Sequence, residues 1–430
     1  MKLIKGSFII AIAIVISVGL AGTASAFHDG GVARCESCHT MHNSFGGGAM
    51  SGTKTTTVGA TGTGDATASS VFLLRGTDQS STCLNCHEGP TLSSYHVSTD
   101  LATITAAANK APVNKTPGGD FGWLRVATTT SASSPMERHG HNIVASDFGY
   151  LADAKNLTAP GGTYDATKLN CVSCHNPHNN KRRTDESGTI ATTGAPIVAS
   201  GSYTDSPVAT ATAAVGVFRF LGGTGYAPKS YSAIPFTNEV PDAISPKSYN
   251  RTEATSDTHV AYGQGMSQWC ANCHGSFYDT AYNSGNASHP HPTNTTLGAT
   301  LLANYNNYVK TGDMTGTKGY DSLVPVEQGS NDYTALKSAA TNTANGGTYA
   351  VADANAKVMC LSCHRAHASG FESMARFYIA GVSITDAAGN YALASGQTTT
   401  LQVQAAYYDR PSTNFAAYQR TLCNKCHAKD

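Results

Sequence analysis

Twelve cysteines stand in six copies of one short pattern, Cys-x-x-Cys-His, and no cysteine lies outside it. Two thiols separated by two residues and followed at once by a histidine form the attachment site of a c-type haem. Each thiol adds to one vinyl group of the porphyrin, and the adjacent histidine coordinates the iron. The predicted attachment residues are Cys35, Cys38, Cys83, Cys86, Cys171, Cys174, Cys270, Cys273, Cys360, Cys363, Cys423 and Cys426, and the predicted proximal ligands are His39, His87, His175, His274, His364 and His427. The sequence therefore predicts six covalently attached haem c groups.

Two other uses of paired cysteines fit this pattern poorly. Zinc ribbons pair two Cys-x-x-Cys units about 15–20 residues apart, whereas the nearest two motifs here begin at Cys35 and Cys83. A disulfide framework, the usual reason for many cysteines in an exported chain, does not require a histidine after every second cysteine. The haem interpretation explains both the spacing and the histidines.

Ten histidines remain after the six proximal ligands are assigned. Six irons with two axial ligands each need six more, so the supply exceeds the demand by four. The remaining histidines are His28, His42, His96, His139, His141, His178, His259, His289, His291 and His367. We expect most of them to be distal ligands, which predicts six low-spin bis-histidine haems at low potential, since methionine ligation would raise the potential.

Three of the remaining histidines, His42, His178 and His367, follow a motif in the extended pattern Cys-x-x-Cys-His-x-x-His. On a helix, a histidine three residues after the proximal one lies about 5–6 Å from it on the same face. The two axial ligands of one iron approach from opposite faces of the porphyrin, so the nearby histidine should serve a different haem. Pro177 weakens the helical argument for His178, and a solvent-facing histidine on the turn is the alternative for each.

The other candidates are less distinctive. His96 is a distal ligand by count alone, and His259 stands close enough to the fourth motif to support a ligand there. His139 and His141 are two residues apart, so they point to different sides and one of them is expected to coordinate. The same alternation applies to His289 and His291. His28 lies near the expected mature N-terminus, from which it can reach a haem, although chain ends are often disordered.

The first 26 residues read as a secretory signal peptide. Lys2 and Lys5 precede the apolar run Phe8 to Ala21, and Ala24-Ser25-Ala26 supplies small residues for cleavage. We expect the domains to be residues 1–26, the signal peptide, and 27–430, a single hexahaem cytochrome domain with no later membrane span. Removal of two lysines and no acid changes the formal net charge from zero to −2, which argues against a nucleic-acid partner.

The composition predicts a loop-dominated multihaem cytochrome c whose core is haem. Polar, small-residue segments such as 51–70, 187–216 and 338–355 show neither helical nor alternating periodicity. We expect them to be ordered loops over haems. Short helices are expected at the six motifs and near 301–310, and a short strand is possible at 402–408.

Several stretches beyond the bare motifs are specific. They are FHDGGVARCESCHTMHNS (27–44), TPGGDFGW (116–123), GHNIV (140–144), YNRTEAT (249–255), AYGQGMSQWCANCH (261–274), CLSCHRAHASGF (360–371) and CNKCHAKD (423–430). In these stretches, and over nearly the whole mature chain, the sequence resembles the extracellular hexahaem cytochromes of metal-reducing bacteria that polymerise into conductive filaments.

The resemblance implies closely stacked bis-histidine haems and subunits joined head to tail, with His42 donated to a haem of the next protomer. It favours His141 over His139 and His289 over His291. His96, His178 and His367 complete the distal set, and His28 is a seventh contender. It also implies a secreted, extracellular or cell-surface protein whose partners are further copies of itself, other cytochromes and extracellular metal oxides.

The expected function is electron transfer to external acceptors such as ferric oxides, by an electron carrier and not by an enzyme. Two alternatives share the motifs. A periplasmic electron shuttle would keep the haems and never polymerise. A multihaem reductase of nitrite or a similar oxyanion would need one iron with an open position; many such enzymes carry lysine in place of one motif histidine, and no Cys-x-x-Cys-Lys occurs in this sequence.

Overall fold

The structure is a computed structural model. It describes residues 35–39, 44–45, 48–49, 73–93, 95–128, 131–135, 137–179, 181–185, 189–197, 200–210, 212–228, 231–246, 253, 259–278, 293, 295–315, 319–341, 354–393 and 397–427. The predicted signal peptide, its boundary at residue 26 and the segment 51–70 lie outside the described residues. No helix in the described part of the chain is both long and apolar enough to cross a membrane.

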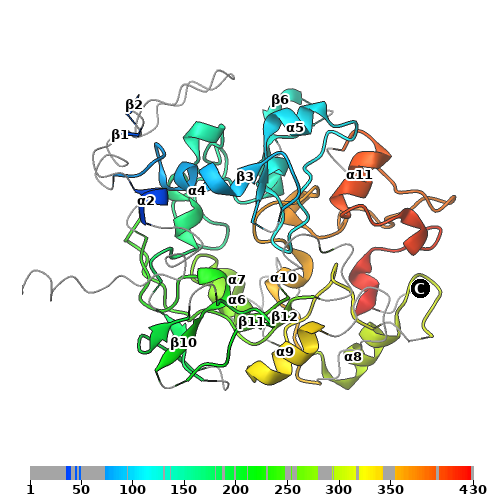
Figure 1. Ribbon diagram of the computed structural model, residues 1–430. Helices are drawn as coiled ribbons and strands as arrows, with labels where there is room; N and C mark the ends of the chain where they lie inside the picture. The colour runs from blue at the N-terminus through cyan, green and yellow to red at the C-terminus, as the bar shows by residue number, and fades with distance from the viewer. Residues whose placement is uncertain are drawn as a thin grey trace, which may run out of the picture.

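Each of the six motifs lies in or at the end of a short helical turn, as predicted, and the rest of the chain is dominated by loops. The motif helices are α2 (Cys35–Cys38), α4 (Gln79–His87), η5 (Cys171–Ser173), α6 (Met266–Cys270), α10 (Cys360–Cys363) and η11 (Leu422–Lys425), where η marks a 3₁₀ turn. Figure 1 shows α6 and α10 near the centre of the molecule, with α2 and α4 toward one edge.

The remaining helices are also short. They are α5 (Leu101–Ala106), α7 (Gly275–Tyr278), α8 (Gly298–Asn307), α9 (Tyr333–Thr341), α11 (Thr400–Ala406), η1 (Phe121–Arg125), η2 (Glu137–His139), η3 (Ser146–Phe148), η4 (Ala166–Lys168), η6 (Phe218–Phe220), η9 (Glu372–Met374) and η10 (Ser412–Asn414). Helix α8 occupies the place where a helix was predicted near 301–310.

The prediction of a short strand at 402–408 is wrong, because residues 402–406 belong to helix α11 and the next residues form a turn. The side chain of Thr399 accepts a hydrogen bond from the backbone N–H of Gln402 and so caps the first turn. Val403 and Ala406, three residues apart, share one buried helix face. Gln404 and Ala405, which stand between them, are good helix formers.

The strands are two to five residues long and form small, separate sheets. The pairs are β1 (Ser44–Phe45) with β2 (Gly48–Ala49), β3 (Glu88–Gly89) with β4 (Ser98–Thr99), β5 (Ala127–Thr128) with β6 (Ser131–Pro135), and β11 (Ala243–Ile244) with β12 (Ala261–Tyr262). A four-stranded sheet has the order β8-β7-β10-β9, formed by Ile190–Ala191, Arg182–Arg183, Ala213–Gly216 and Ala195–Pro196.

Two segments predicted as loops therefore contain regular structure. Strands β8, β9 and β10 lie within 187–216, and helix α9 extends into 338–355 as far as Thr341. Burial of small residues explains both differences: Ala214 and Val215 of β10 and Ala340 of α9 are almost inaccessible to solvent. Their packing against neighbouring elements outweighs the weak periodicity of the sequence.

Apolar side chains form several clusters that fix the motif helices in place. The largest cluster includes Trp123 of η1, Tyr305 of α8 and Val403 of α11. A second cluster joins Met266, just before the fourth motif, to Met359, just before the fifth. Helices α6 and α10 accordingly pack against each other, and so do α4 and η5.

Candidate haem-binding sites

The backbone of each motif presents its histidine in the same way. In five of the motifs the histidine N–H donates to the carbonyl of the first cysteine, over distances of 2.9–3.1 Å for His39, His175, His274, His364 and His427. His87 is the last residue of α4 itself. This one-turn geometry places two cysteines and a histidine around one position, as attachment of a single haem requires.

The twelve cysteines bring consecutive motifs together. All twelve are described, and no disulfide joins any two of them. The Cys83 thiol hydrogen-bonds to Cys171, and Cys270 to Cys360. The other neighbours, close enough for their charges to interact, are Cys38 with Cys86, Cys174 with Cys273, and Cys363 with Cys423 and Cys426. The six motifs therefore follow one another in space in the order of the chain.

Three pairs of histidines face each other at a common spacing. The ring centroids lie 6.0 Å apart for His39 and His178, 6.1 Å for His141 and His274, and 6.3 Å for His175 and His367. An iron midway between two imidazoles, with metal–nitrogen bonds of about 2 Å, places the ring centroids about 6 Å apart. Each pair joins a motif histidine to a predicted distal histidine from elsewhere in the chain.

The histidines that follow a motif by three residues face other motifs. His178 follows the third motif but lies against His39 of the first. His367 follows the fifth motif but lies against His175 of the third. The arrangement agrees with the geometric expectation that two histidines on one face of a turn serve different irons. The assignment of these residues as ligands remains a prediction.

The candidate distal histidine of the second motif, His96, is close to that motif in the sequence. His96 lies close enough to His87 for their charges to interact. Parallel pairing of β3 with β4, together with the bond from the Val97 N–H to the His87 carbonyl (2.9 Å), returns the chain to this point. Gly89 is required here, since a Cβ atom at this position would lie 2.2 Å from the His96 ring.

Backbone carbonyls orient the candidate ligands through Nδ1. The Nδ1 atoms of His87, His175, His274 and His364 lie 2.6–2.8 Å from the carbonyl oxygens of Tyr95, Arg219, Pro160 and Ser373, and those of His96 and His141 lie 2.8 and 2.7 Å from Thr91 and Ala366. An N–H at Nδ1 that donates to a carbonyl leaves Nε2 as the coordinating atom, a common arrangement for metal-bound histidine.

Burial favours the neutral imidazole that metal coordination requires. Burial, reinforced by the charge of His274, lowers the pKa of His141 to about 4. Burial, reinforced by His175, lowers the pKa of His367 to about 3. The pKa values of His87, His274 and His364 are also lowered, with burial as the main cause. These rings are thus uncharged over the physiological pH range.

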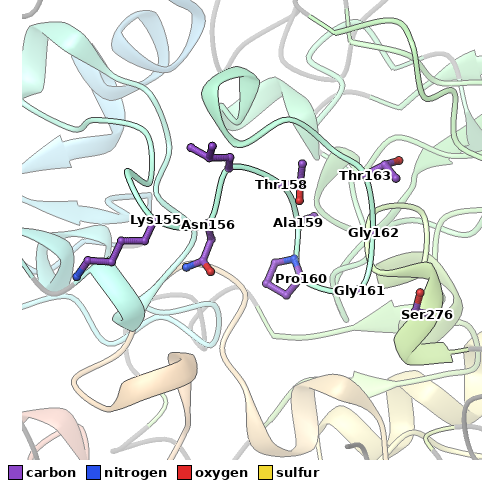
Figure 2. A pocket seen from close by; sticks show the side chains of 10 residues that line it. Lys155, Asn156, Thr158, Ala159, Pro160, Gly161, Gly162, Thr163 and Ser276 are labelled. Atoms are coloured by element: carbon purple, nitrogen blue, oxygen red, sulfur yellow. The ribbon is translucent and has the colours of Figure 1, made fainter. Parts of the chain in front are cut away.

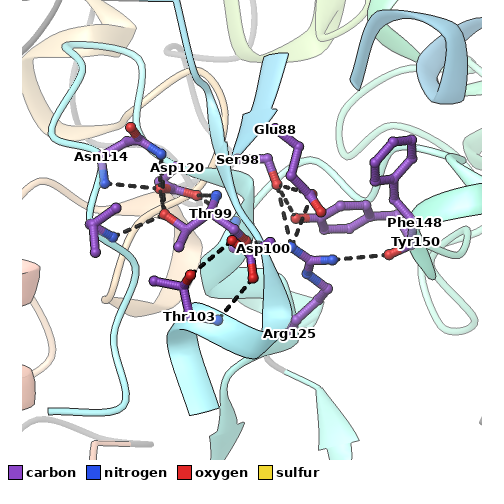
Figure 3. Close-up of polar contacts among 12 residues, drawn as sticks. Glu88, Ser98, Thr99, Asp100, Thr103, Asn114, Asp120, Arg125, Phe148 and Tyr150 are labelled. Carbon is purple, nitrogen blue, oxygen red and sulfur yellow. Dashed lines mark hydrogen bonds and ion pairs between the residues drawn. The ribbon is translucent and has the colours of Figure 1, made fainter. Parts of the chain in front are cut away.

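The segment TPGGDFGW supports His367. The Phe121 ring stacks on the His367 ring, with centroids 4.7 Å apart. Gly119 has φ +98°, and a Cβ atom there would lie 1.9 Å from the carbonyl oxygen of Ala368. The fully buried Asp120 anchors this turn: its carboxylate accepts hydrogen bonds from the Thr99 and Gly122 backbone N–H groups (2.9 and 2.7 Å), among others (Figure 3).

A loop that holds His274 also forms the wall of a cavity. The cavity has a volume of about 540 Å³ and is lined by residues 155–163 and Ser276 (Figure 2). Pro160 in this loop accepts the hydrogen bond from His274, and the Gly161 carbonyl accepts one from the Ser276 N–H (2.8 Å).

Four histidines of the sequence prediction, His28, His42, His289 and His291, lie outside the described residues. Of the two that the prediction set aside, His139 is buried with Nδ1 3.0 Å from the Ser369 carbonyl oxygen. His259 is 0 % exposed and packs on the Tyr320 ring at 4.1 Å. Within the described residues, no group of three or more His, Cys, Asp or Glu side chains could hold a bare metal ion.

Sequence reasoning missed the residues that orient the ligands. Arg219 and Ser373, whose carbonyls lie next to His175 and His364, have φ values of 51° and 58°. Left-handed backbone is unfavourable for such residues and concentrates at functional sites. Nothing in the residue types marks these positions, because the carbonyl group is common to every residue.

Comparison with known proteins identifies the family. No established family model matches the chain. The C-type cytochrome OmcS of Geobacter sulfurreducens is 52 % identical over 434 residues, which cover 95 % of this chain and 96 % of that protein. Two solved structures, the OmcS nanowires and the outer membrane cytochrome S filament from the same organism, each match with a TM-score of 0.79 and 50 % identity over 94 % of this chain and 100 % of theirs. The predicted resemblance is confirmed, and the chain belongs to the OmcS family of c-type cytochromes.

Proposed function

We propose that this protein transfers electrons through six covalently attached haem c groups, each held by two histidines, and that its copies polymerise into a filament outside the cell. The observation that carries the proposal is the recurrence of facing histidine pairs at 6.0–6.3 Å beside motifs that follow one another in space. The close relation to OmcS, whose solved structures are filaments, supports the polymer.

The proposed ligand set pairs each motif histidine with one distal histidine. Within one chain the pairs are His39 with His178, His87 with His96, His175 with His367, and His274 with His141. The fifth and sixth motifs then receive ligands from the part of the sequence that is not described: His289 from the same chain and His42 from a neighbouring copy, with His28 as a further contender.

Such a set makes the protein an electron carrier. All six irons would be low-spin, and bis-histidine ligation sets lower potentials than histidine–methionine ligation does. The haem supplies the redox step, and the protein supplies ligands, spacing and cover. The order of the motifs gives a continuous path from the first haem to the last. The external partners are other cytochromes and extracellular metal oxides.

The exchange of His42 between copies is open to a direct test. A contact in which one copy donates a ligand to the next is heterologous, and a heterologous contact that does not close on itself produces a filament. His42→Ala should therefore give single protein particles with one altered haem, as seen by electron microscopy of the secreted holoprotein. His96→Ala is the matched control, because it also removes one distal imidazole but leaves the junction intact and should still form filaments.

Filaments of normal length from the His42→Ala protein would exclude His42 from the junction. The two alternative functions are separated by other measurements. A periplasmic shuttle would stay monomeric at every concentration, with the wild-type sequence. A nitrite-type reductase would reduce nitrite or hydroxylamine catalytically as a pure protein, and it would show one high-spin iron in its electron paramagnetic resonance spectrum.

A further inference from the structure

Four charged side chains form a buried cluster beside the fifth motif: Glu253, Arg365, Arg376 and Arg410. Their exposed fractions are 1 %, 1 %, 1 % and 6 %. The Glu253 carboxylate accepts two hydrogen bonds from Arg365 (3.0 and 3.1 Å) and one from Arg376 (3.1 Å), and Arg410 lies 3.6 Å away. Glu253 belongs to the segment YNRTEAT (249–255), which supplies no cysteine or histidine to the proposed haem sites.

The cluster carries a net charge of +2. Arginine is always protonated in proteins. Burial alone would raise the pKa of Glu253, but the charges of Arg365 and Arg376 and their hydrogen bonds outweigh burial and lower it, so the group is a carboxylate. A second buried acid, Glu327, lies near Cys360. The positive charge of nearby Lys357 offsets the negative charge of Glu327.

The excess charge is fixed directly to the fifth motif. Arg365 is the residue after His364. The Arg376 Nε–H donates to the carbonyls of Leu361 (2.7 Å) and His364 (3.1 Å), both within or next to α10. Solvent screens charges poorly inside a protein, where the effective dielectric constant is far below that of water. A haem attached at Cys360 and Cys363 therefore lies in the positive electrostatic potential of the cluster, with little screening by solvent.

The second motif offers a comparison within the same molecule. There the residue after the proximal histidine is Glu88, which pairs one to one with Arg125 at 3.0 Å (Figure 3). That pair is neutral. A further carboxylate, Asp78, caps the motif helix α4 through the Ser81 N–H (2.7 Å) and lies near the thiols of Cys83 and Cys171. The buried side chains beside the second motif thus carry a charge that is neutral to negative.

We propose that the Glu253–Arg365–Arg376–Arg410 cluster raises the reduction potential of the haem at the fifth motif above that of the haem at the second motif. Reduction adds one electron to the haem, and a nearby positive charge favours that step. In a partly reduced chain, electrons therefore occupy the fifth haem in preference to the second. The inference rests on the proposed six-haem electron carrier but does not depend on polymerisation.

The test is a spectroelectrochemical titration of holoprotein variants. Arg410→Gln removes one positive charge at the edge of the cluster and should move one haem's share of the curve, about one sixth of the absorbance change, to lower potential. A tenfold change in the reduction equilibrium corresponds to about 59 mV for one electron. Glu253→Gln removes the negative charge and should move the same part to higher potential.

Two controls separate charge from disturbance of the fold. Arg410→Lys keeps the charge and should leave the curve nearly unchanged. Arg138→Gln removes the same charge from an arginine whose side chain is 67 % exposed and pairs with Glu372 at 3.7 Å, where solvent screening should reduce the shift to a small fraction. Loosened packing around the haem would move both cluster variants in one direction.

Opposite shifts of the same one sixth of the curve in Arg410→Gln and Glu253→Gln establish the proposal. Shifts in the same direction, shifts confined to the last-reduced haems, or equal effects of Arg410→Gln and Arg138→Gln overturn it. If Glu253→Gln does not fold with its full haem content, Arg410→Gln judged against Arg410→Lys decides the question. A wrong haem count in the wild-type protein would instead refute the proposed function.

Discussion

Replacing His178 by alanine should open one coordination position on the haem of the first motif, although His178 follows the third. The imidazoles of His178 and His39 lie 6.0 Å apart and are nearly parallel, at 16°. The proximal histidine of the third motif, His175, instead faces His367 at 6.3 Å. The substitution therefore tests whether the facing pairs, and not closeness in sequence, define the ligand sets.

The expected size of the effect follows from the motif count. One iron in six loses its distal imidazole, so about one sixth of the haem should change from low to high spin. His178 is exposed, and substitutions at exposed positions typically change the free energy of unfolding by about 0.5 kcal/mol or less apart from a lost ligand bond. The other five haems should keep their spectra.

The assay is quantitative electron paramagnetic resonance in two backgrounds. The first is the natural chain. The second replaces Cys35, Cys38 and His39 by alanine, so that the haem of the first motif is never attached. His178→Ala should add one high-spin iron per chain in the first background and none in the second. His367→Ala, whose expected iron is present in both, should add one in each. A high-spin iron from His178→Ala in the second background would refute the facing-pair reasoning.

Three further predictions concern the framework around the haems. Asp120→Asn should lower the free energy of unfolding by about 2–4 kcal/mol, since an amide cannot accept from all the donors around this carboxylate; the urea midpoint followed by tryptophan fluorescence measures it. Gly119→Ala should cost more than about 2 kcal/mol in the same assay, because of its φ of +98° and the Ala368 carbonyl, whereas Gly389→Ala, at φ +78° with no atom within 4 Å, should cost about 1 kcal/mol. Because the pKa of Glu253 is lowered from 4.5 in the folded protein, its contribution to stability is present above pH 4.5 and should be lost as the pH falls below it; acid titration of Glu253→Gln should lack this step, and an unchanged step would contradict the assignment.

The sequence predicts the motif helices because the requirement is local. Attachment of one haem by Cys35, Cys38 and His39 needs a single tight turn, and the same turn recurs five times. The cross-motif placement of His178 and His367 also follows from local geometry, since two histidines on one face cannot hold one iron. Both inferences depend on residue type and spacing alone.

Other features depend on partners distant in the chain. Glu253 hydrogen-bonds to Arg365, which lies more than a hundred residues further along the chain. No pattern in YNRTEAT predicts that this acid is buried. The small strands of 187–216 and the helix at 400–406 are stabilised by packing against residues distant in the chain, which the local sequence does not reveal. Residue spacing alone likewise leaves His139 and His141 as alternatives; the family resemblance favours His141, and it is His141 that faces His274 in the structure.

The facing histidines also have a consequence for how the protein is made. In the proposed ligand set, iron bonds join residue 39 to 178, 141 to 274, and 175 to 367. These closed loops overlap in succession, so each one begins before the previous one ends. No N-terminal fragment can complete its coordination while the chain is still emerging. Completion of these pairs must therefore wait until residue 367 has been exported, and a chain truncated before that residue should fail as a whole instead of yielding a smaller cytochrome.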